Sequence, residues 1–370
     1  MADPKYWVGF NLVTGIGPVK TGRLLKAFDG DLATAWNADP QTLRSAGLDR
    51  GALGNLLETR ATLDLNAEMQ RISALGITVV TLEHPDYPRL LREIYDPPPV
   101  LYVKGQLLAE DEWAVAVVGT RAATTYGKEA ARQIAGGLAR NGLTIVSGLA
   151  RGIDSTAHRA SLEAGGRTIG VLGCGLDIIY PPENRRLATQ IVQQGSLISE
   201  YPLGTPPEGG NFPPRNRIIS GMSLGTVVVE AGSRSGALIT ADRALAQGRE
   251  VFAVPGNIFR RASQGTNALI QDGATPALSV RDILETLNLS MISQQQVARA
   301  IIPENETESR LLDYLSADPI HVDEIGQQTG LPISEVTSVL TLMELKGMVR
   351  QVGGMRYVLA REQGVEYMID

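Results

Sequence analysis

Short runs of apolar, β-branched residues recur through the middle of the chain, and segments with helical periodicity separate most of them. Each run is nearly continuous in apolar residues, which is typical of strands buried on both faces of a sheet. Helical patterns span residues 127–141, 155–164 and 237–247. Repeated strand–helix units predict a doubly wound, mostly parallel sheet with helices on both faces. The predicted strands are residues 115–118, 144–146, 168–172, 197–199, 226–229 and 251–254.

Small residues, hydroxyl groups and arginines follow these predicted strands. The carboxyl ends of parallel strands meet at one edge of the sheet, which is where such sheets bind ligands. Glycine lets a ligand approach the backbone, and helix N-termini at this edge favour anions. Any strand–helix turn needs glycine, but that need does not explain the arginines. The segments are residues 119–121, 147–152, 173–175, 200–202, 230–236 and 255–256.

Two common nucleotide-binding motifs are absent from these turns. A P-loop requires Gly-x-x-x-x-Gly-Lys-Ser/Thr, whereas the spacing from Gly119 to Gly127 is too long and Lys128 precedes a glutamate. A dinucleotide fingerprint requires Gly-x-Gly-x-x-Gly after the first strand. Gly173 and Gly175 lack the third glycine at the required position. The sequence therefore argues against an enzyme that uses a nicotinamide cofactor.

Asp154 and His158 stand four residues apart on a predicted helix and would share a face. They could form an acid–base or metal pair, but no third ligand is evident. We favour a local role, in which Asp154 caps the helix and His158 packs against the next strand. With Cys174 as the only cysteine and the three histidines far apart, no zinc cluster is expected. We expect no metal and no cofactor.

One enzymatic alternative remains open. Residues 232–240 are similar to the loop of phosphoribohydrolases that release a base from its nucleotide on a Rossmann-like fold. That family uses a Pro-Gly-Gly-x-Gly-Thr-x-x-Glu loop. Here Ile239 and Thr240 occupy the region where the catalytic glutamate is expected.

Charge and hydropathy narrow the class of protein further. The net charge of −6 and the pI near 5.3 argue against broad, non-specific binding of nucleic acid but allow a local basic site. No apolar run approaches the ~20 residues of a membrane helix. The N-terminal residues lack the pattern of a secretory signal. We expect a cytoplasmic protein with no membrane partner.

Changes in pattern along the chain predict three domains. Residues 1–70 are helical, and residues 77–288 form a Rossmann-like α/β domain. A glutamine-containing segment at residues 289–305 is typical of a linker. Residues 306–362 are predicted to form a winged helix.

A series of motifs in the middle domain resembles the DNA-processing protein family DprA, also called Smf. They include Ser-Gly-Leu-Ala-Arg-Gly-Ile-Asp at residues 147–154 and Pro-Pro-Arg-Asn-Arg-Ile-Ile-Ser-Gly at residues 213–221. The resemblance spans residues 80–280, and many motifs in one order make it far more specific than a single glycine loop. The full set is residues 119–121, 147–158, 171–177, 180–184, 212–221, 235–241, 254–256 and 265–267.

The resemblance implies binding of incoming single-stranded DNA during natural transformation and loading of the RecA recombinase onto it. It also implies a homodimer through the Rossmann-like domain and no catalytic activity. Residues 265–275 are candidates for the dimer contact, because Ala268, Leu269 and Ile270 would lie beside a sheet edge that needs cover.

The residue types at the predicted sheet edge suit unpaired DNA. The planar fork of Arg121 could hold a phosphate with two hydrogen bonds. Tyr180 and Phe212 could stack on bases or simply pack within their loops. The candidate DNA-binding residues are Gly119, Thr120, Arg121, Ser147, Gly148, Arg151, Tyr180, Asn184, Phe212, Arg215, Asn216, Arg217, Gly232, Ser233, Arg234, Ser235 and Gly236.

The flanking domains offer weaker signals. Residues 12–19 resemble the hairpin of a helix-hairpin-helix unit, whose turn could present amides to a phosphate, and residues 43–48 resemble a weaker copy. The alternative, which the sequence supports equally, is that this helical region packs like a sterile-alpha-motif domain and does not contact DNA. Helices at residues 307–315, 322–329 and 333–346 and a wing at 349–358 define the winged helix. Its third helix is too acidic for a DNA reader, which favours a structural or protein-contact role.

Overall fold

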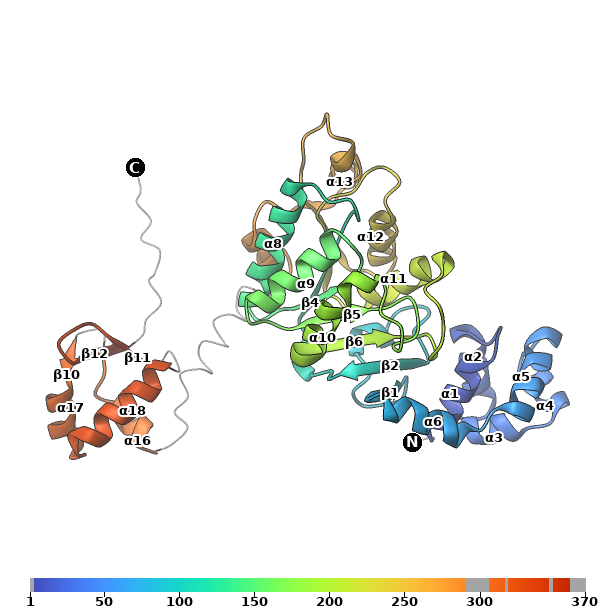
Figure 1. Ribbon diagram of the computed structural model, residues 1–370, viewed down its shortest axis with the longest axis horizontal. Helices are drawn as coiled ribbons and strands as arrows, with labels where there is room; N and C mark the ends of the chain where they lie inside the picture. The colour runs from blue at the N-terminus through green and yellow to red at the C-terminus, as the bar shows by residue number, and fades with distance from the viewer. Residues whose placement is uncertain (1–2, 290–305, 317–318, 346–348, 360–370) are drawn as a thin grey trace. The chain divides into compact units, whose positions relative to one another are not determined.

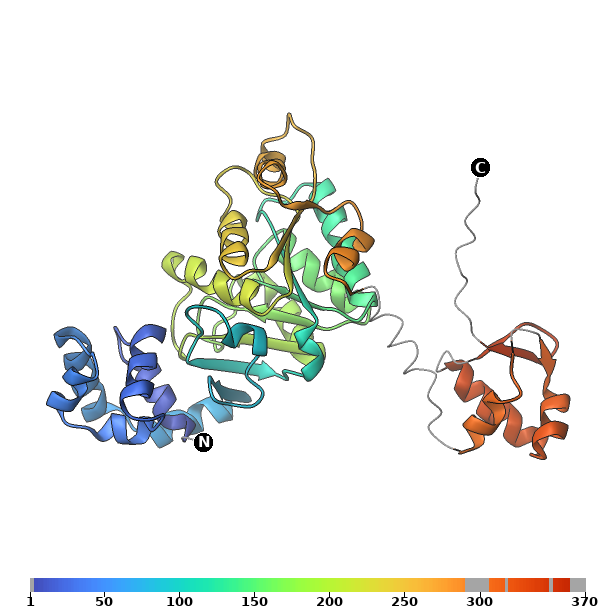
Figure 2. The same ribbon diagram turned by 180° about the vertical axis from the view of Figure 1, so that it is seen from behind.

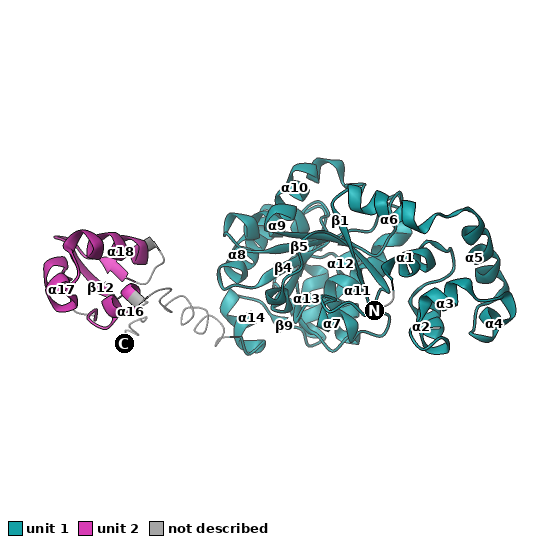
Figure 3. Cartoon of the chain, turned by 90° about the horizontal axis from the view of Figure 1, so that it is seen from below, with its two compact units in different colours: residues 1–289 teal, residues 290–370 magenta. Residues whose placement is uncertain are grey.

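The computed structural model describes residues 3–289, 306–316, 319–345 and 349–359, which fall into two compact units. Unit 1 comprises residues 1–289 and unit 2 residues 290–370 (Figure 3). The predicted linker at 289–305 lies, except for Leu289, outside the described residues.

A nine-stranded sheet forms the centre of unit 1 within residues 3–289, in the order β1-β2-β6-β5-β4-β3-β7-β8-β9. The seven strands from β6 to β9 in this order run parallel, and β2 joins β6 and β1 in antiparallel pairs. The strands are β1 (Ile77–Thr81), β2 (Val100–Gly105), β3 (Ala114–Val118), β4 (Thr144–Ser147), β5 (Thr168–Val171), β6 (Gly195–Ser199), β7 (Gly225–Val228), β8 (Glu250–Ala253) and β9 (Thr275–Pro276).

Helices cover both faces of this sheet (Figures 1 and 2). The strands are apolar on both sides, so β3 is fully buried: Ala114, Ala116 and Val118 pack with α11 and α12, and the alternate residues face the opposite layer. Helices α8, α9 and α10 form that opposite layer. The helices of this region are α7 (Arg89–Arg92), α8 (Thr125–Arg140), α9 (Ile153–Glu163), α10 (Arg185–Gln194), α11 (Phe212–Gly221), α12 (Gly236–Ala246), α13 (Gln264–Gln271) and α14 (Val280–Thr286).

Six helices precede the sheet. Aspartate side chains cap five of them by accepting backbone N–H groups, which is a strong helix-start signal. The helices share a hydrophobic cluster with the sheet: Trp7 and Phe10 belong to the same cluster as Val100 and Tyr102. These helices are α1 (Pro4–Leu12), α2 (Pro18–Ala27), α3 (Leu32–Asn37), α4 (Pro40–Ser45), α5 (Arg50–Thr62) and α6 (Leu65–Ala74).

Unit 2 has the helices and three-stranded sheet of a winged helix, with its own hydrophobic cluster. The strand order is β10-β12-β11, and both pairs are antiparallel. Its elements are α16 (Glu306–Leu312), β10 (Ile320–His321), α17 (Val322–Thr329), α18 (Ile333–Leu345), β11 (Val349–Gln351) and β12 (Arg356–Leu359).

The predicted α/β class is confirmed, and each of the six predicted strands is present within two residues of its expected bounds. The pattern missed β1, β2 and β9. Residues 1–70, which were predicted to form a separate helical domain, contribute most of α1 to α6, and these helices lie in the same compact unit as the sheet.

Candidate nucleic-acid site

A pocket of about 680 Å³ opens at the carboxyl ends of β3 and β7. From β3 the chain builds the sheet outward through β4, β5 and β6, and then returns to place β7 on the other side of β3. Such a reversal leaves a crevice between the two strands, which is the usual ligand position in a doubly wound sheet. We call this cavity the switch-point pocket. Its walls come from residues 118–122 after β3, from α11 and from the start of α12.

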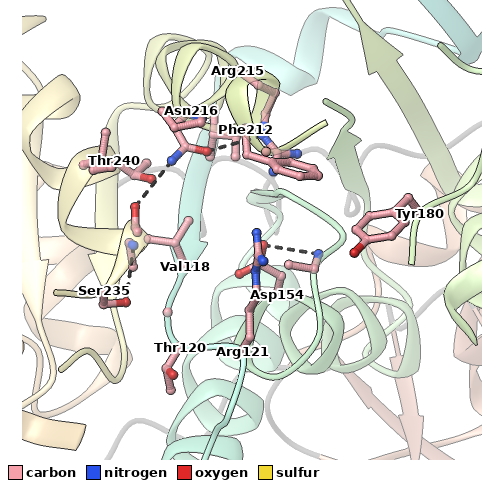
Figure 4. Close-up of a pocket in the computed structure, with 18 of the residues that line it drawn as sticks. Val118, Thr120, Arg121, Asp154, Tyr180, Phe212, Arg215, Asn216, Ser235 and Thr240 are labelled. Atoms are coloured by element: carbon pink, nitrogen blue, oxygen red, sulfur yellow. Dashed lines mark hydrogen bonds between the residues drawn. The ribbon is translucent and has the colours of Figure 1, made fainter. Parts of the chain in front are cut away.

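Aromatic rings and guanidinium groups meet in this pocket (Figure 4). The guanidinium carbon of Arg121 lies 5.3 Å from the ring centroid of Phe212, and that of Arg215 lies 5.8 Å from the same ring. The Tyr180 ring lies 5.9 Å from Phe212, with an angle of 31° between the two planes. The Phe212 ring is thus in contact with two guanidinium groups and one further aromatic ring.

The two arginines differ sharply in exposure. Arg121 is exposed and, within the described residues, forms no ion pair. The Arg215 side chain is buried and donates to the carbonyl oxygens of Gly148 and Val171. Burial lowers the pKa of Arg215 to about 10, against the opposing charge of Asp154, so the group stays cationic at neutral pH. Arg215 is thus a buried positive charge in the pocket wall, and Arg121 is an exposed one at its mouth.

Asp154 lies beside Gly148, opposite Arg215. Its carboxylate accepts the Gly148 N–H at 3.1 Å and the Ala150 N–H at 3.4 Å, and burial raises its pKa. A Cβ on Gly148 would stand 2.8 Å from both the Asp154 carboxylate and the Arg215 guanidinium, so any larger residue would displace one of these two groups. The expected helix cap was wrong: Gly152 occupies the N-cap position of α9, and Asp154 instead holds the preceding loop.

His158 packs against the next strand as predicted. Its Nδ1 lies 2.7 Å from the hydroxyl of Thr168 on β5, and that hydroxyl donates to Ile145 O. Since the Thr168 proton is used, Nδ1 must be the donor and Nε2 carries the lone pair. Burial lowers the pKa of His158 to about 3, so the ring is neutral at physiological pH.

Comparison with known proteins identifies the family. A family model described as DNA recombination-mediator protein A matches residues 78–288, and a DprA winged helix domain model matches residues 295–355. The chain is 37% identical to Protein Smf of Synechocystis sp. over 96% of this chain and 98% of that protein. It is 42% identical to the DNA processing protein DprA of Bacillus subtilis, over 68% of this chain and 88% of that protein. The chain belongs to the DprA family.

Two solved structures of DprA share its fold. DprA from Streptococcus pneumoniae superimposes with a TM-score of 0.67 at 36% identity, over 77% of this chain and 98% of that one. DprA from Helicobacter pylori superimposes with a TM-score of 0.52 at 32% identity, over 57% of this chain and 95% of that one. The latter structure is described as giving insight into a single-stranded DNA binding mode.

The structure of this DprA-family chain brings most of the candidate residues together. The candidate residues are scattered over residues 119–236 of the sequence, and the fold gathers most of them at the carboxyl ends of β3 and β7. The switch-point pocket is lined by Gly119, Thr120, Arg121, Tyr180, Phe212, Arg215, Asn216, Ser235 and Gly236. A small adjoining hollow adds Gly148 and Arg151, although Arg151 is ion-paired with Glu183.

Three candidates are instead buried structural groups, which corrects the expectation for them. The Ser147 hydroxyl donates to Val117 O at 2.6 Å, and the Asn184 amide donates to Leu149 O at 2.9 Å. Arg217 is 4% exposed and pairs with Glu200 and Asp96. None of the three lines the switch-point pocket.

Three further candidates lie beside the pocket without lining it. They belong to the loop between β7 and α12, whose later residues form the pocket wall: Gly232, Ser233 and Arg234. Ser233 and Arg234 are exposed to solvent.

The candidate DNA-binding residues did not include several residues that complete the pocket wall. Thr240 follows Gly236 by one helical turn, so the periodicity of α12 could have placed it on the same face. Pro207 and Gly209 line the opposite rim from an irregular loop. No local pattern indicates which residues of such a loop face a cavity.

Within residues 3–289 and the described parts of unit 2, no cluster of three or more histidine, cysteine or acidic residues could hold a metal ion. Across the same residues, no helix is long and apolar enough to cross a bilayer.

Proposed function

We propose that this DprA-family chain binds single-stranded DNA in the switch-point pocket and delivers it to the RecA recombinase during natural transformation. The observation that carries the proposal is the surface formed by Arg121, Phe212 and Tyr180. A cationic fork and two aromatic rings at a single cavity match the two parts of a nucleotide, its phosphate and its base.

The pocket chemistry favours unpaired bases. Base–aromatic stacking contributes about 1–3 kcal/mol per base, and it needs a base face that is not already stacked in a duplex. Phe212 and Tyr180 are partly exposed and can offer such a surface. Arg121 can hold the adjacent phosphate with its free fork. A cavity of this size admits a flipped or single-stranded nucleotide but not the width of a double helix.

The acidic net charge is compatible with this proposal because the field that DNA meets is local. Arg121 carries no ion-paired carboxylate among the described residues, and Arg215 adds a fixed charge behind it. The affinity should therefore follow a few arginines rather than the net charge.

The direct test compares single-stranded and double-stranded DNA of one sequence in a mobility-shift titration with the full chain. We expect preferential binding of the single strand. Equal affinity for both forms would contradict the proposed stacking site. For delivery, the chain should accelerate RecA filament formation on strands already coated with single-strand-binding protein, and no acceleration would refute that part.

We further propose that the pocket catalyses no reaction. The alternative of a phosphoribohydrolase lacks support in the lining residues, because Ile239 and Thr240 lie in the wall near the position of the expected glutamate. Incubation with nucleoside monophosphates should release no free base. Release that is lost in Asp154→Asn would establish the enzymatic alternative.

We also propose a homodimer through the outer edge of the Rossmann-like domain. The edge strand β9 has two residues, and Leu278 beyond it is 77% exposed. On α13, Ala268 is exposed and Ile270 partly so. Short edge strands and apolar side chains of this kind are commonly covered. Light scattering at micromolar concentration should give twice the chain mass of 39.6 kDa, and the monomer mass would refute the dimer.

A further inference from the structure

A second hollow, which we call the outer groove, lies beside the switch-point pocket. It encloses about 900 Å³ at the carboxyl ends of β7 and β8. Residues 124–126 at the start of α8 form one wall, and residues 255–260 after β8 form the other. The DprA motif at residues 254–256 reaches into this second wall, but it does not include Ile258, Phe259 or Arg260.

The same two loops line both cavities. The loop after β3 gives residues 118–122 to the switch-point pocket and residues 124–126 to the outer groove. The segment after β7 gives Glu230 to the outer groove and residues 235–237 to the pocket. The loops are joined where the Thr120 N–H donates to Glu230 O at 2.7 Å. The two cavities are therefore adjacent, and a DNA strand bound in the switch-point pocket would reach the outer groove by crossing these shared loops.

The wall formed by residues 255–260 is apolar, aromatic and unusually exposed. Phe259 is 88% exposed and Ile258 is 73% exposed, and the loop stands out from the domain ahead of α13 (Figure 1). Across the groove, Tyr126 is 55% exposed. Its hydroxyl donates to Pro255 O at 2.7 Å, which fixes the ring and leaves its exposed face available. Rings held in this way are suitable platforms for stacking.

The rim of the outer groove is cationic. Arg234, Arg260 and Arg261 are exposed, and none forms an ion pair with any residue that the structure describes. Gly232 lies against the backbone of Arg261, so the loops that carry these arginines are neighbours. The one carboxylate among the described residues that line the groove is Glu230, which is buried and accepts both the N–H and the hydroxyl of Thr124. Within that part of the chain, the positive charge at the rim is left without a protein counter-charge.

We propose that the outer groove is a second contact for the same single strand of DNA. A base stacks on Phe259 and faces Tyr126, while Arg260 and Arg234 neutralise the phosphates that lead back to the switch-point pocket. This inference rests on the proposed function, because the strand enters from that pocket. It extends the DNA path to residues that the family motifs leave unassigned.

A second copy of the chain is the other occupant to consider. In a two-fold symmetric contact the same surface patch lies on both partners. Three exposed arginines would then face their own copies, which is unfavourable without a counter-charge. A polyanion supplies that charge, so the rim favours DNA over self-association.

The test measures binding of oligothymidylates of about 6 and about 20 nucleotides by fluorescence anisotropy, with the full chain. The short strand fills about one pocket and the long strand can cover both. Phe259→Ala combined with Arg260→Ala should weaken the long strand by about tenfold and leave the short strand within about twofold. The control Tyr95→Ala removes an aromatic side chain that is 94% exposed and lines neither cavity, and it should change neither affinity.

The other outcomes test the outer groove and the switch-point pocket separately. Unchanged long-strand binding in the double variant overturns the outer groove, and a halved mass by light scattering in that variant would assign the surface to a second copy. Phe212→Ala should weaken both strands. Phe212→Ala could instead leave the affinity for both oligonucleotides unchanged while the double variant still weakens binding of the long one. That result would rule out the switch-point pocket as a DNA site, and it would also overturn the proposed path from the pocket to the groove. Mass-spectrometric mapping of a strand carrying 5-iodouracil should find crosslinks at Phe259 or Tyr126, and crosslinks confined to the switch-point pocket would refute the groove.

Discussion

The guanidinium carbon of Arg121 lies 5.3 Å from the ring centroid of Phe212, although the two residues are far apart in sequence. Arg121 follows β3, the first of the parallel strands, and Phe212 begins α11. The contact positions a flexible cationic side chain over an aromatic face, where a cation–π interaction contributes about 0.5–1 kcal/mol at an exposed site. The ring thereby holds the guanidinium at the mouth of the pocket.

Arg121→Ala should weaken binding of single-stranded DNA and reduce the slope of log affinity against log salt by about one unit, because one phosphate contact is lost. The matched control is Arg132→Ala on α8, which removes an exposed arginine paired with Glu129. Anisotropy titrations at several salt concentrations measure both quantities. An unchanged slope in a folded Arg121→Ala protein would remove Arg121 from the phosphate site.

Phe212→Ala should raise the dissociation constant by about tenfold, through a lost stacking platform worth about 1–3 kcal/mol, and leave the salt slope intact. Phe212→Trp keeps an aromatic face and should retain most of the affinity. A loss that appears mainly in the salt slope would mean that the ring acts only by orienting Arg121.

Arg217→Ala should lower stability rather than DNA affinity per folded molecule. The change leaves Glu200, which is 14% exposed at its side chain, without its partner, and breaking a buried ion pair costs about 3–5 kcal/mol. Thermal unfolding should show a clear drop in midpoint. Arg217→Met combined with Glu200→Met should recover part of it. Normal stability together with lost DNA binding would return Arg217 to the site.

The contrast between Arg215 and Arg217 marks the limit of the sequence motif. Both belong to one Pro-Pro-Arg-Asn-Arg segment, and both were expected at the DNA site. Residues two apart on an α-helix point about 200° away from each other, so one faces the pocket and the other the ion pair with Glu200. The motif indicates the helix but not its rotation on the sheet, which depends on packing against α12 and β5.

The ends of the parallel strands, unlike the rotation of α11, could be predicted from the sequence. Buried parallel strands carry a strong local signal, and the chain must turn back where they end, so the sequence alone could assign Gly119 and Arg121 to one edge of the sheet. The antiparallel strands β1 and β2 could not be assigned in this way, because their position depends on pairing with β6 across the sheet. The burial of Ser147 and Asn184 likewise follows from contacts with distant backbone carbonyls.

Acid should destabilise unit 1 through His158. Its pKa is about 3 in the folded chain against an ordinary value of 6.5, so the unfolded chain binds the extra proton. The contribution is complete above pH 6.5 and is lost progressively as the pH falls toward 3, by on the order of 2 kcal/mol at pH 5. Asp154, whose pKa is raised, acts in the opposite direction above its ordinary value of 3.8.

His158→Asn separates the two groups, because the amide can donate to Thr168 as Nδ1 does but cannot be protonated in this range. Its unfolding midpoint should fall less steeply than that of the parent chain between pH 6.5 and pH 5. His84→Asn, which changes a partly exposed histidine, is the matched control. Parallel curves for the parent and His158→Asn would show that the buried imidazole does not set the acid response.

A fragment of residues 1–303 should keep its single-strand affinity within a few-fold and its salt slope unchanged. All the candidate arginines belong to unit 1, whereas α18, the third helix of the winged helix, carries Glu335 and Glu344 and no basic residue between Ile333 and Leu345. Affinity for DNA follows neutralised phosphates. A folded fragment that loses most of its affinity would place part of the DNA site in the winged helix.

The hydrophobic cluster that joins α1 to the sheet also limits how freely the N-terminal helices can be exchanged between related proteins. Tyr102 on β2 donates to Asn11, and the Asn11 amide reaches Glu200 O at the end of β6. Trp7 and Phe10 complete the apolar side of this contact. Removing the helices would expose that surface to water, so they should melt together with the sheet in one cooperative transition. An exchange of N-terminal regions between relatives would therefore require matching changes in β1 and β2, unlike the winged helix, which has a core of its own.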